Sequence, residues 1–394
     1  MAAKRLGNLP GFAVDVICLQ PADTSIRIDS SLDSYVAERF SHIERIAPPL
    51  PLKAVARRRI GAIFEIPGLS HLMNRKAYRA AERLRPENYA GMVTWSQWHA
   101  VHLVGLALKL RFPKLPWIAH FSDPWSDNPF EFFGGALRGY DRWRETKVYA
   151  AADCLSFTSR ETIDLVFSGQ RAAYRGKAVE FPHAFEPALY PPEQSRRGGP
   201  LMLRSLGAFY GARSPEPLFH ALAILRERQP ALFDRIRVEL IGPIAAEFHA
   251  SRALHDLPQE VVRLLPPVDY KTSLALMRSS DLLLNIDAPF AQSVFLPSKL
   301  VDYIGAGRPI FGISPPGTAA RVIRDLGGWV TSPDDPQAIA AALASALNFA
   351  ETNRNSPWGD PTIRQSYAAS AIAEQFDCLI RNTIEDSARK PVKT

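Results

Sequence analysis

Short apolar runs bounded by turn residues, each followed by an amphipathic stretch, recur along almost the whole chain. Strands that alternate with helices in this way form βα units, which build parallel sheets covered by helices. In the first half the pattern predicts strands at 14–19, 91–95, 117–121, 154–158 and 178–181, and helices at 100–111, 140–151 and 161–167. The feature therefore predicts an α/β fold.

A second α/β series follows an interruption rich in proline, glycine and charge, "EPALYPPEQSRRGGP" at 186–200. Such composition is typical of an exposed link between domains. The later strands are predicted at 201–206, 237–241, 261–264, 282–286 and 309–313, and helices at 216–228, 271–278, 298–304 and 336–349. A chain of 394 residues also exceeds one ordinary core. We expect an N-terminal domain at 1–190, a second domain at 200–365, and a C-terminal helix with a polar tail at 366–394.

The charge and cysteine content restrict the partners and the compartment. The formal net charge of +7 favours an anionic partner, which could be nucleic acid, a phosphorylated substrate or a membrane surface. Three isolated cysteines fit a reducing cytosol, and neither a signal peptide nor a bilayer-length apolar run occurs. We expect a cytoplasmic protein.

Basic residues are concentrated in the first quarter of the chain, including the run Arg57 to Arg59. Arg75, Arg79 and Arg83 repeat every four residues with alanine and leucine opposite, which predicts a helix with one basic and one apolar face. Both a solvated face and a membrane-surface helix fit this pattern. Nucleic-acid binding ranks last, because interleaved aromatic residues and a groove-reading motif are missing.

The segment "LPSKLVDYIGAGRPIFGI" at 296–313 carries the most specific chemistry. Ser298 is predicted to cap a helix whose first-turn amides, together with Lys299, would bind an anion. Asp302, about one turn later, could accept hydrogen bonds from ribose hydroxyls. The alternative is that Ser298 only caps, Lys299 is solvated and Asp302 complements the helix dipole. Gly305 and Gly307 are predicted to end the helix, and "GAG" without a third glycine does not support a dinucleotide-binding motif.

Four segments together resemble family 4-type glycosyltransferases of the GT-B fold. The segment at 296–335 is similar to their nucleotide-sugar-binding segment, and "LRSLGAFYGARSPEPLFHAL" at 203–222 to the opening of their second domain. "VTWSQWHAVHLVGLALKLRFPKLPWIAHFSDPW" at 93–125 resembles their acceptor-domain stretch, and "FPHAFEP" at 181–187 the segment before the interdomain crossing. The resemblance spans roughly 14–376 and implies two Rossmann-type doubly wound domains facing a central cleft.

This resemblance implies transfer of a sugar from a nucleotide diphosphate sugar to an acceptor hydroxyl, with retention and without a catalytic metal or other cofactor. Polysaccharide or glycoconjugate synthesis follows as the expected process, with a sugar or lipid-linked acceptor at the inner face of the cell membrane and no nucleic acid. The alternative is a non-catalytic nucleotide- or glycan-binding member of the same fold.

The resemblance also assigns roles to particular residues. Donor binding falls to Gly207, Arg213, Val268, Ser298, Lys299 and Asp302, since fixed cations and N–H donors would stabilise the departing diphosphate. His102 and Asp123 are the candidate catalytic residues of the first domain, and His99 and His183 could also reach the cleft. Structural roles remain open for each of these histidines and for Asp123 as a turn former, whereas His120 is expected to be buried.

The sequence departs from the family pattern at three places. Val294 stands where the first glutamate of the paired-glutamate motif would contact the donor sugar, and Arg213 is not followed by the usual lysine. The chain also begins in the helix that follows the first strand and glycine loop of such folds. We expect either a start that lies further upstream or a first domain that lacks its first strand.

Overall fold

The computed structural model describes residues 2–20, 29–47, 67–96, 98–129, 136–193, 195 and 198–389. The chain divides into two compact units. The C-terminal unit comprises residues 183–371, and the N-terminal unit comprises residues 2–182 together with 372–394. The C-terminal unit thus begins ahead of the link at 186–200, and most of the last helix joins the N-terminal unit.

The N-terminal unit contains two parallel sheets. The larger has the order β3 (Met92–Ser96), β4 (Trp117–Phe121), β5 (Cys154–Phe157) and β6 (Ala178–Glu180), and the smaller pairs β1 (Asp15–Leu19) with β2 (His42–Ile46). Its longer helices are α5 (Pro67–Arg83), α6 (Val101–Arg111), α7 (Ala136–Ala151), α8 (Arg160–Val166) and α18 (Ala369–Arg389), and the shorter ones are α1 (Ala2–Leu6), α2 (Asp33–Ala37) and the 3₁₀ segments η1 (Pro86–Asn88) and η2 (Gly169–Lys177). Every residue of β4 is buried, as expected of an interior strand with both faces covered.

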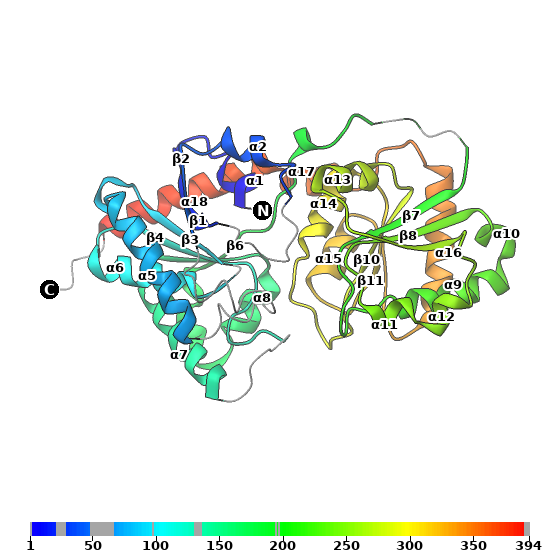
Figure 1. The fold of residues 1–394 in the computed structure, drawn as a ribbon, viewed down its shortest axis with the longest axis horizontal. Coiled ribbons are helices and arrows are strands. Elements are labelled where there is room, and N and C mark those ends of the chain that lie inside the picture. Colours follow the sequence, from blue (N-terminus) through cyan, green and yellow to red (C-terminus); the bar gives the residue numbers. More distant parts are fainter. Residues whose placement is uncertain are drawn as a thin grey trace. The chain divides into compact units, whose positions relative to one another are not determined.

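The C-terminal unit is built on one six-stranded parallel sheet of order β12-β11-β10-β7-β8-β9 (Figure 1). Its strands are β7 (Leu201–Leu206), β8 (Ile236–Ile241), β9 (Val262–Leu265), β10 (Leu282–Ile286), β11 (Ile310–Ile313) and β12 (Trp329–Thr331). Numbered within the unit, the order is 6-5-4-1-2-3, which is the doubly wound arrangement. The chain order reverses between β7 and β10, where ligands of such folds bind.

Helices cover both faces of this sheet. One core joins it to α9 (Glu216–Arg228) and α16 (Pro336–Thr352), and the other to α13 (Tyr270–Arg278), α14 (Ser298–Ala306) and α15 (Thr318–Asp325). Short helices α10 (Pro230–Phe233), α11 (Ala246–His249), α12 (Arg252–His255), α17 (Pro361–Ser366) and η3 (Pro187–Leu189) complete the unit. Asp269 and Asp335 accept hydrogen bonds from the first-turn amides of α13 and α16, which explains where these helices start.

Two strands escape the sequence-based prediction. β2, "HIERI", alternates charge with isoleucine but is partly exposed, and β12 is only three residues long. Both lie at sheet edges, where a strand needs less apolar sequence than an interior one. The other predicted strands are found within one or two residues of the predicted bounds.

The predicted helix with a basic face is α5. Arg75, Arg79 and Arg83 are exposed, whereas Ala80 is buried in a small cluster with Ile46. The apolar face therefore packs within the unit. Arg57 to Arg59 lie outside the described residues.

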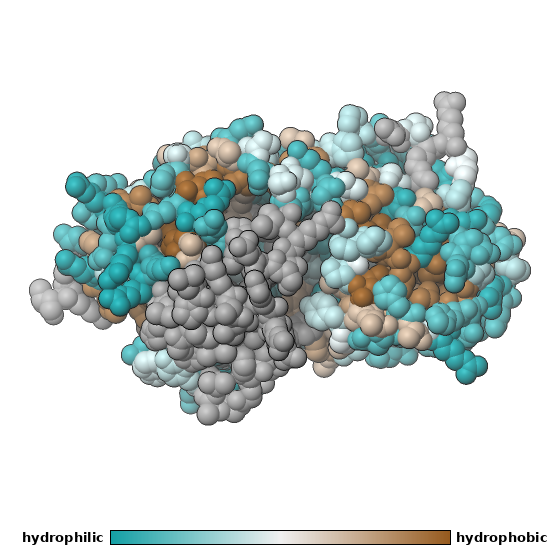
Figure 2. Space-filling model, viewed as in Figure 1, coloured by the Kyte–Doolittle hydropathy of each residue, from teal (hydrophilic) through white to brown (hydrophobic). Residues whose placement is uncertain are grey.

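Hydrophilic and apolar residues intermingle over the coloured surface of Figure 2. Among the described residues, no helix combines the length and the apolar character needed to span a membrane.

Candidate functional site

In the sheet of the C-terminal unit, β7 and β10 are paired over only part of their length, at the place where the strand order reverses. β10 pairs with β7 only at Leu282 with Leu203 and at Leu283 with Arg204, although both strands continue beyond these pairs. The Tyr303 hydroxyl accepts the Leu206 amide at 2.7 Å, replacing a ladder partner at the carboxyl end of β7. The loops that follow β7 and β10 therefore start beside an opening rather than a continuous ladder.

Two glycines allow the loops after β7 and β8 to touch. Gly207 has φ 141° and Gly242 has φ 149°, a region that side-chain-bearing residues rarely adopt. A Cβ on Gly242 would lie 2.2 Å from the Gly207 carbonyl oxygen. A Cβ on Gly207 would lie 3.2 Å from Lys299 Cδ and 3.6 Å from Lys299 Nζ. The predicted site residue Gly207 is thus where the chain lies against the Lys299 side chain.

Lys299 carries a buried ammonium group without a hydrogen-bond partner among the described residues. The stem lies along Gly207, and Nζ is 5.7 Å from the centre of the Phe209 ring. Burial, followed by repulsion from Arg213, lowers the pKa of Lys299 to about 7, while Asp287 acts in the opposite direction. A buried, unpaired cation is costly, so this group is suited to receive an anion.

Arg213 faces the same place from the loop after β7. A tight turn, in which the Arg213 amide donates to the Tyr210 carbonyl oxygen at 3.0 Å, sets its position. Its guanidinium lies 3.6 Å from Asp287, and its Nε is buried without a partner in the described part of the chain. The structure therefore brings Arg213, Gly207 and Lys299 together, as the sequence predicts.

The start of α14 corrects one prediction. The N-cap residue is Pro297, with φ −61° and ψ 130°, and Ser298 is the first helical residue. The N-cap makes no side-chain hydrogen bond, so Ser298 does not have the predicted capping role. Within the described part of the chain, the first turn therefore begins without a capping side chain, which suits an anion-binding helix start. Gly307, with φ 67°, ends the helix as predicted, whereas Gly305 lies inside it.

Asp302 lies on the buried side of α14 and is held from two directions. The Tyr270 hydroxyl donates to Asp302 Oδ1 at 2.8 Å, and the Tyr190 hydroxyl donates to its backbone carbonyl at 2.7 Å. Tyr270 begins α13, directly after the loop that contains Val268, which is 37% exposed. Tyr270 thus links the carboxylate of Asp302 to the helix that follows the Val268 loop.

The site also contains two polar residues that sequence reasoning missed. Asp287 follows β10 and accepts a hydrogen bond from the Ser293 hydroxyl at 2.8 Å. Asn285 is fully buried, and neither its amide oxygen nor its amide nitrogen has a partner in the described residues. Asn285 shares a sheet face with Leu283, whose core includes α14. One sequence signal could have identified them: Asn285 and Asp287 are polar residues at, and just after, the carboxyl end of the strand predicted at 282–286, where such folds bind ligands.

The candidate residues of the N-terminal unit gather after β3 and β4. His102 is fully buried, with Thr94 Oγ1 2.7 Å from its Nδ1, and its ring lies 4.1 Å from the Phe121 ring. His99 stacks on Trp125 at 5.4 Å. Burial lowers the pKa of His102 well below its ordinary value and that of His99 to about 3, so both rings are neutral at pH 7.

Asp123 remains the most accessible of these candidates. It is half-buried and lies two residues after the end of β4, at the carboxyl edge of a parallel sheet. His120 is fully buried between Ser156 and Trp95, as expected, and His183 is buried at the start of the C-terminal unit. Asp123 is therefore better placed than His102 to contact a substrate.

Comparisons with known proteins place this geometry in a fold class. No protein-family model matches the chain. A curated relative, D-inositol 3-phosphate glycosyltransferase of Streptomyces scabiei, is 27% identical over 176 residues, covering 43% of this chain and 36% of the relative. The chain spans little more than a third of the length of the curated relatives it matches.

Two solved structures match nearly the whole chain. Anabaena HepE, solved with UDP-glucose, has a TM-score of 0.58 at 15% identity and covers 95% of this chain and 99% of its own. The α,α-trehalose 6-phosphate synthase of Burkholderia multivorans has a TM-score of 0.61 at 11% identity and covers 95% of this chain and 100% of its own. The α/β architecture is that of the GT-B glycosyltransferases, which confirms the fold expected from the sequence.

Proposed function

We propose that this protein is a glycosyltransferase that moves a sugar from a nucleotide diphosphate sugar to an acceptor hydroxyl. The observation that carries the proposal is the buried Lys299 ammonium group, unpaired among the described residues, beside Arg213 and the start of α14. A diphosphate would neutralise both cations and accept the uncapped amides. The UDP-glucose bound to HepE supports this ligand class.

The donor would be held by residues of the C-terminal unit alone. Arg213, Lys299 and the first-turn amides from Ser298 onward would bind the diphosphate, and the Asp302 carboxylate would accept ribose hydroxyls. Gly207 would allow close approach to the phosphates, and the Val268 loop would lie near the base. Charge that develops on the leaving diphosphate would then be stabilised by fixed cations, without a catalytic metal or another cofactor.

In the N-terminal unit we assign the catalytic contact to Asp123 and a positioning role to His102. A carboxylate at the carboxyl end of β4 could accept the proton of an acceptor hydroxyl. His102 is buried beneath Phe121, and its neutral ring suits support of the neighbouring loop. Retention at the anomeric carbon and a role in polysaccharide or glycoconjugate synthesis remain parts of this proposal.

Calorimetric titration with uridine and guanosine diphosphates tests the donor site. We expect micromolar binding to the whole chain and at least tenfold weaker binding to Arg213→Ala, because one charge-assisted contact is lost. An absence of binding to the unmodified chain, or identical affinities for the two proteins, would refute the donor-site proposal.

A second candidate is a binding protein of the same fold without turnover. The specific observation is Val294, a buried apolar residue where the resemblance expects a glutamate that contacts the donor sugar. Measuring the release of nucleoside diphosphate in the presence of cell lipid extract separates the two candidates. Release above the no-protein background supports a transferase, and tight nucleotide binding without release supports the binding protein.

Peripheral contact with an anionic membrane is a further part of the proposal. Arg75, Arg79 and Arg83 are exposed on one face of α5, where Arg83 also pairs with Glu44, while Ala80 on the other face is buried. Membrane contact through this helix would therefore be electrostatic rather than insertive. Cosedimentation with phosphatidylglycerol vesicles should be lost when the three arginines are changed to glutamine, and unchanged sedimentation would contradict it.

A further inference from the structure

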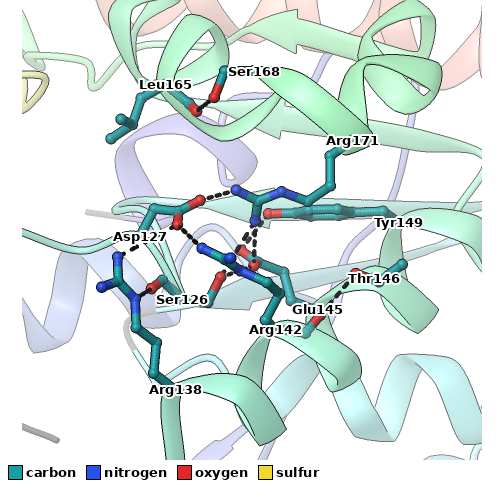
Figure 3. A network of polar contacts seen from close by, with 10 residues as sticks. All are labelled: Ser126, Asp127, Arg138, Arg142, Glu145, Thr146, Tyr149, Leu165, Ser168 and Arg171. Carbon is teal, nitrogen blue, oxygen red and sulfur yellow. Dashed lines mark hydrogen bonds and ion pairs between the residues drawn. The ribbon is translucent and has the colours of Figure 1, made fainter. Parts of the chain in front are cut away.

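The loop at 122–128 carries Asp123, and two of its later residues, Ser126 and Asp127, are held by side chains of α7 and by Arg171 (Figure 3). It follows β4 and ends in a turn in which the Asn128 amide donates to the Trp125 carbonyl oxygen. At its start, the Thr158 hydroxyl donates to the Ser122 carbonyl oxygen at 2.9 Å. The residues that follow Asp123 are held much more extensively.

Helix α7 contacts three successive residues of the loop. Arg144 lies over the Trp125 ring at 5.4 Å, Arg138 Nε donates to the Ser126 carbonyl oxygen at 3.0 Å, and Arg142 donates to Asp127 at 2.7 Å. Glu145 accepts the Ser126 hydroxyl and, on its other oxygen, the Tyr149 hydroxyl. The backbone and side chains of this turn are thus bound to one helix face.

Arg171 joins the loop and α7 from a distant part of the sequence. It belongs to η2, between α8 and β6. Its Nη1 lies 2.9 Å from Glu145 Oε2 and 3.3 Å from Ser126 Oγ, and its Nη2 pairs with Asp127. The side chain is 11% exposed, and that of Glu145 is not exposed at all. One planar guanidinium therefore satisfies a loop carboxylate and a helix carboxylate at once.

The Arg171 network is better explained by the geometry that it fixes than by the stability that it adds. Buried ion pairs contribute little net stability, because desolvation offsets most of the attraction, and apolar residues often serve equally well. A guanidinium fork, however, fixes two acceptors in one geometry. Burial also raises the pKa of Glu145 to about 7, while the hydrogen bonds from Ser126 and Tyr149 act in the opposite direction.

We infer that Arg171 is a positioning residue that, through Glu145 and Asp127, holds the loop at 122–128 so that Asp123 is presented at the carboxyl end of β4. This inference rests on the proposed function, in which Asp123 contacts the acceptor. In this role Arg171 would act through Glu145 and Asp127 and would contact neither substrate nor reacting atoms. Catalytic groups need placement within a fraction of an ångström, which a turn held only by its own backbone does not guarantee.

The test uses the full chain with Arg171→Lys, which retains the charge but loses the fork. The matched control is Arg175→Lys in the same η2 segment, where the native arginine pairs with Asp164 at an exposed position. Circular dichroism first establishes that both variants fold. Crystal structures should then show Asp123 displaced by more than about 1 Å in Arg171→Lys and unmoved in Arg175→Lys. An unmoved Asp123 in Arg171→Lys would overturn the inference.

Kinetics give a second readout, with UDP-glucose as the donor probe and cell lipid extract as the acceptor source. Arg171→Lys should lower kcat by roughly 10- to 100-fold and leave the KM for UDP-glucose within about twofold. If Arg171 acts through Asp123, the double variant with Asp123→Asn should be no slower than Asp123→Asn alone. Multiplying losses, or an unchanged kcat, would contradict the inference.

Failure of the proposed function is detected separately. UDP titration of the unmodified chain reports on the C-terminal unit, which contains none of these loop residues. A protein that binds no nucleotide would remove the proposed function, whereas the crystallographic comparison would still decide whether Arg171 sets the loop. If the unmodified chain does not turn over UDP-glucose, the kinetic readout falls away, and the crystal structures of the two variants alone decide the role of Arg171.

Discussion

The two polar clusters of this protein use buried charge in opposite ways. In the C-terminal unit, Lys299 Nζ and Arg213 Nε are buried without hydrogen-bond partners among the described residues. In the N-terminal unit, Asp127 pairs with Arg138, Arg142 and Arg171, and Glu145 pairs with Arg171 and accepts the hydroxyls of Ser126 and Tyr149. A buried ammonium group without a hydrogen-bond partner indicates a place prepared for an incoming ion, whereas carboxylates that accept from several donors fix the chain.

The largest expected effect follows from breaking the paired cluster. Arg171→Ala leaves Glu145 and Asp127 without their shared guanidinium, and removing one partner of a buried ion pair typically costs about 3–5 kcal/mol. We expect a loss of that size in the free energy of unfolding, measured by urea titration. Arg175→Ala, at an exposed pair, should change it by less than about 1 kcal/mol.

A smaller effect is expected at Lys299, and it should fall on nucleotide affinity rather than on folding stability. Lys299→Met should weaken UDP binding by about 10- to 100-fold, equivalent to about 1.4–2.8 kcal/mol, because a charge-assisted contact is lost. The melting temperature should stay unchanged or rise, since a buried cation without a partner is removed. A fall in melting temperature like that of Arg171→Ala would erase the contrast between the clusters.

The pH dependence of UDP-glucose binding tests whether the unpartnered Lys299 ammonium group is the one that binds the diphosphate. Only protonated Lys299 attracts a diphosphate, and with a pKa near 7 in the free protein its charged fraction falls as pH rises. UDP-glucose, whose diphosphate does not titrate in this range, should therefore bind about fivefold more weakly at pH 8 than at pH 7. Calorimetry across pH 6.5–8.5 measures this. Lys299→Met should show no such slope.

The smallest predicted effect concerns Asp302. Tyr270→Phe removes the hydroxyl that donates to its carboxylate, a change expected to cost about 0.5–1.5 kcal/mol in the affinity for UDP. The affinity for inorganic pyrophosphate, which lacks a ribose, should not change. If Tyr270→Phe lowered the affinities for UDP and for pyrophosphate equally, the Tyr270 hydroxyl would not act through the ribose.

Much of the fold could be read from the sequence because the three sheets of the described residues are all parallel. Buried parallel strands such as β4, β7 and β10 are largely apolar runs between turn residues, and the structure confirms their predicted positions within a residue or two. β2 and β12 were missed because edge strands need no such run.

The candidate site was only partly predictable. Gly207, Arg213 and Lys299 were predicted because a resemblance and a helix start pointed to them, and the structure places them close together, while their role in donor binding stays a prediction. Ser298 was misplaced by one position, since Pro297 is itself the N-cap. Asp287 contacts Arg213, 74 positions away, and Arg171 contacts Asp127, 44 positions away, and Glu145, 26 positions away, which no local pattern records.

The central claim is that the unpaired Lys299 ammonium group and Arg213 bind the diphosphate of an activated sugar. The most direct measurement is a crystal structure of the full chain with UDP. The account predicts a phosphate oxygen within hydrogen-bonding distance, about 2.7–3.2 Å, of Lys299 Nζ, with a second oxygen at Arg213. UDP bound elsewhere, with Lys299 Nζ still unpaired, would contradict it.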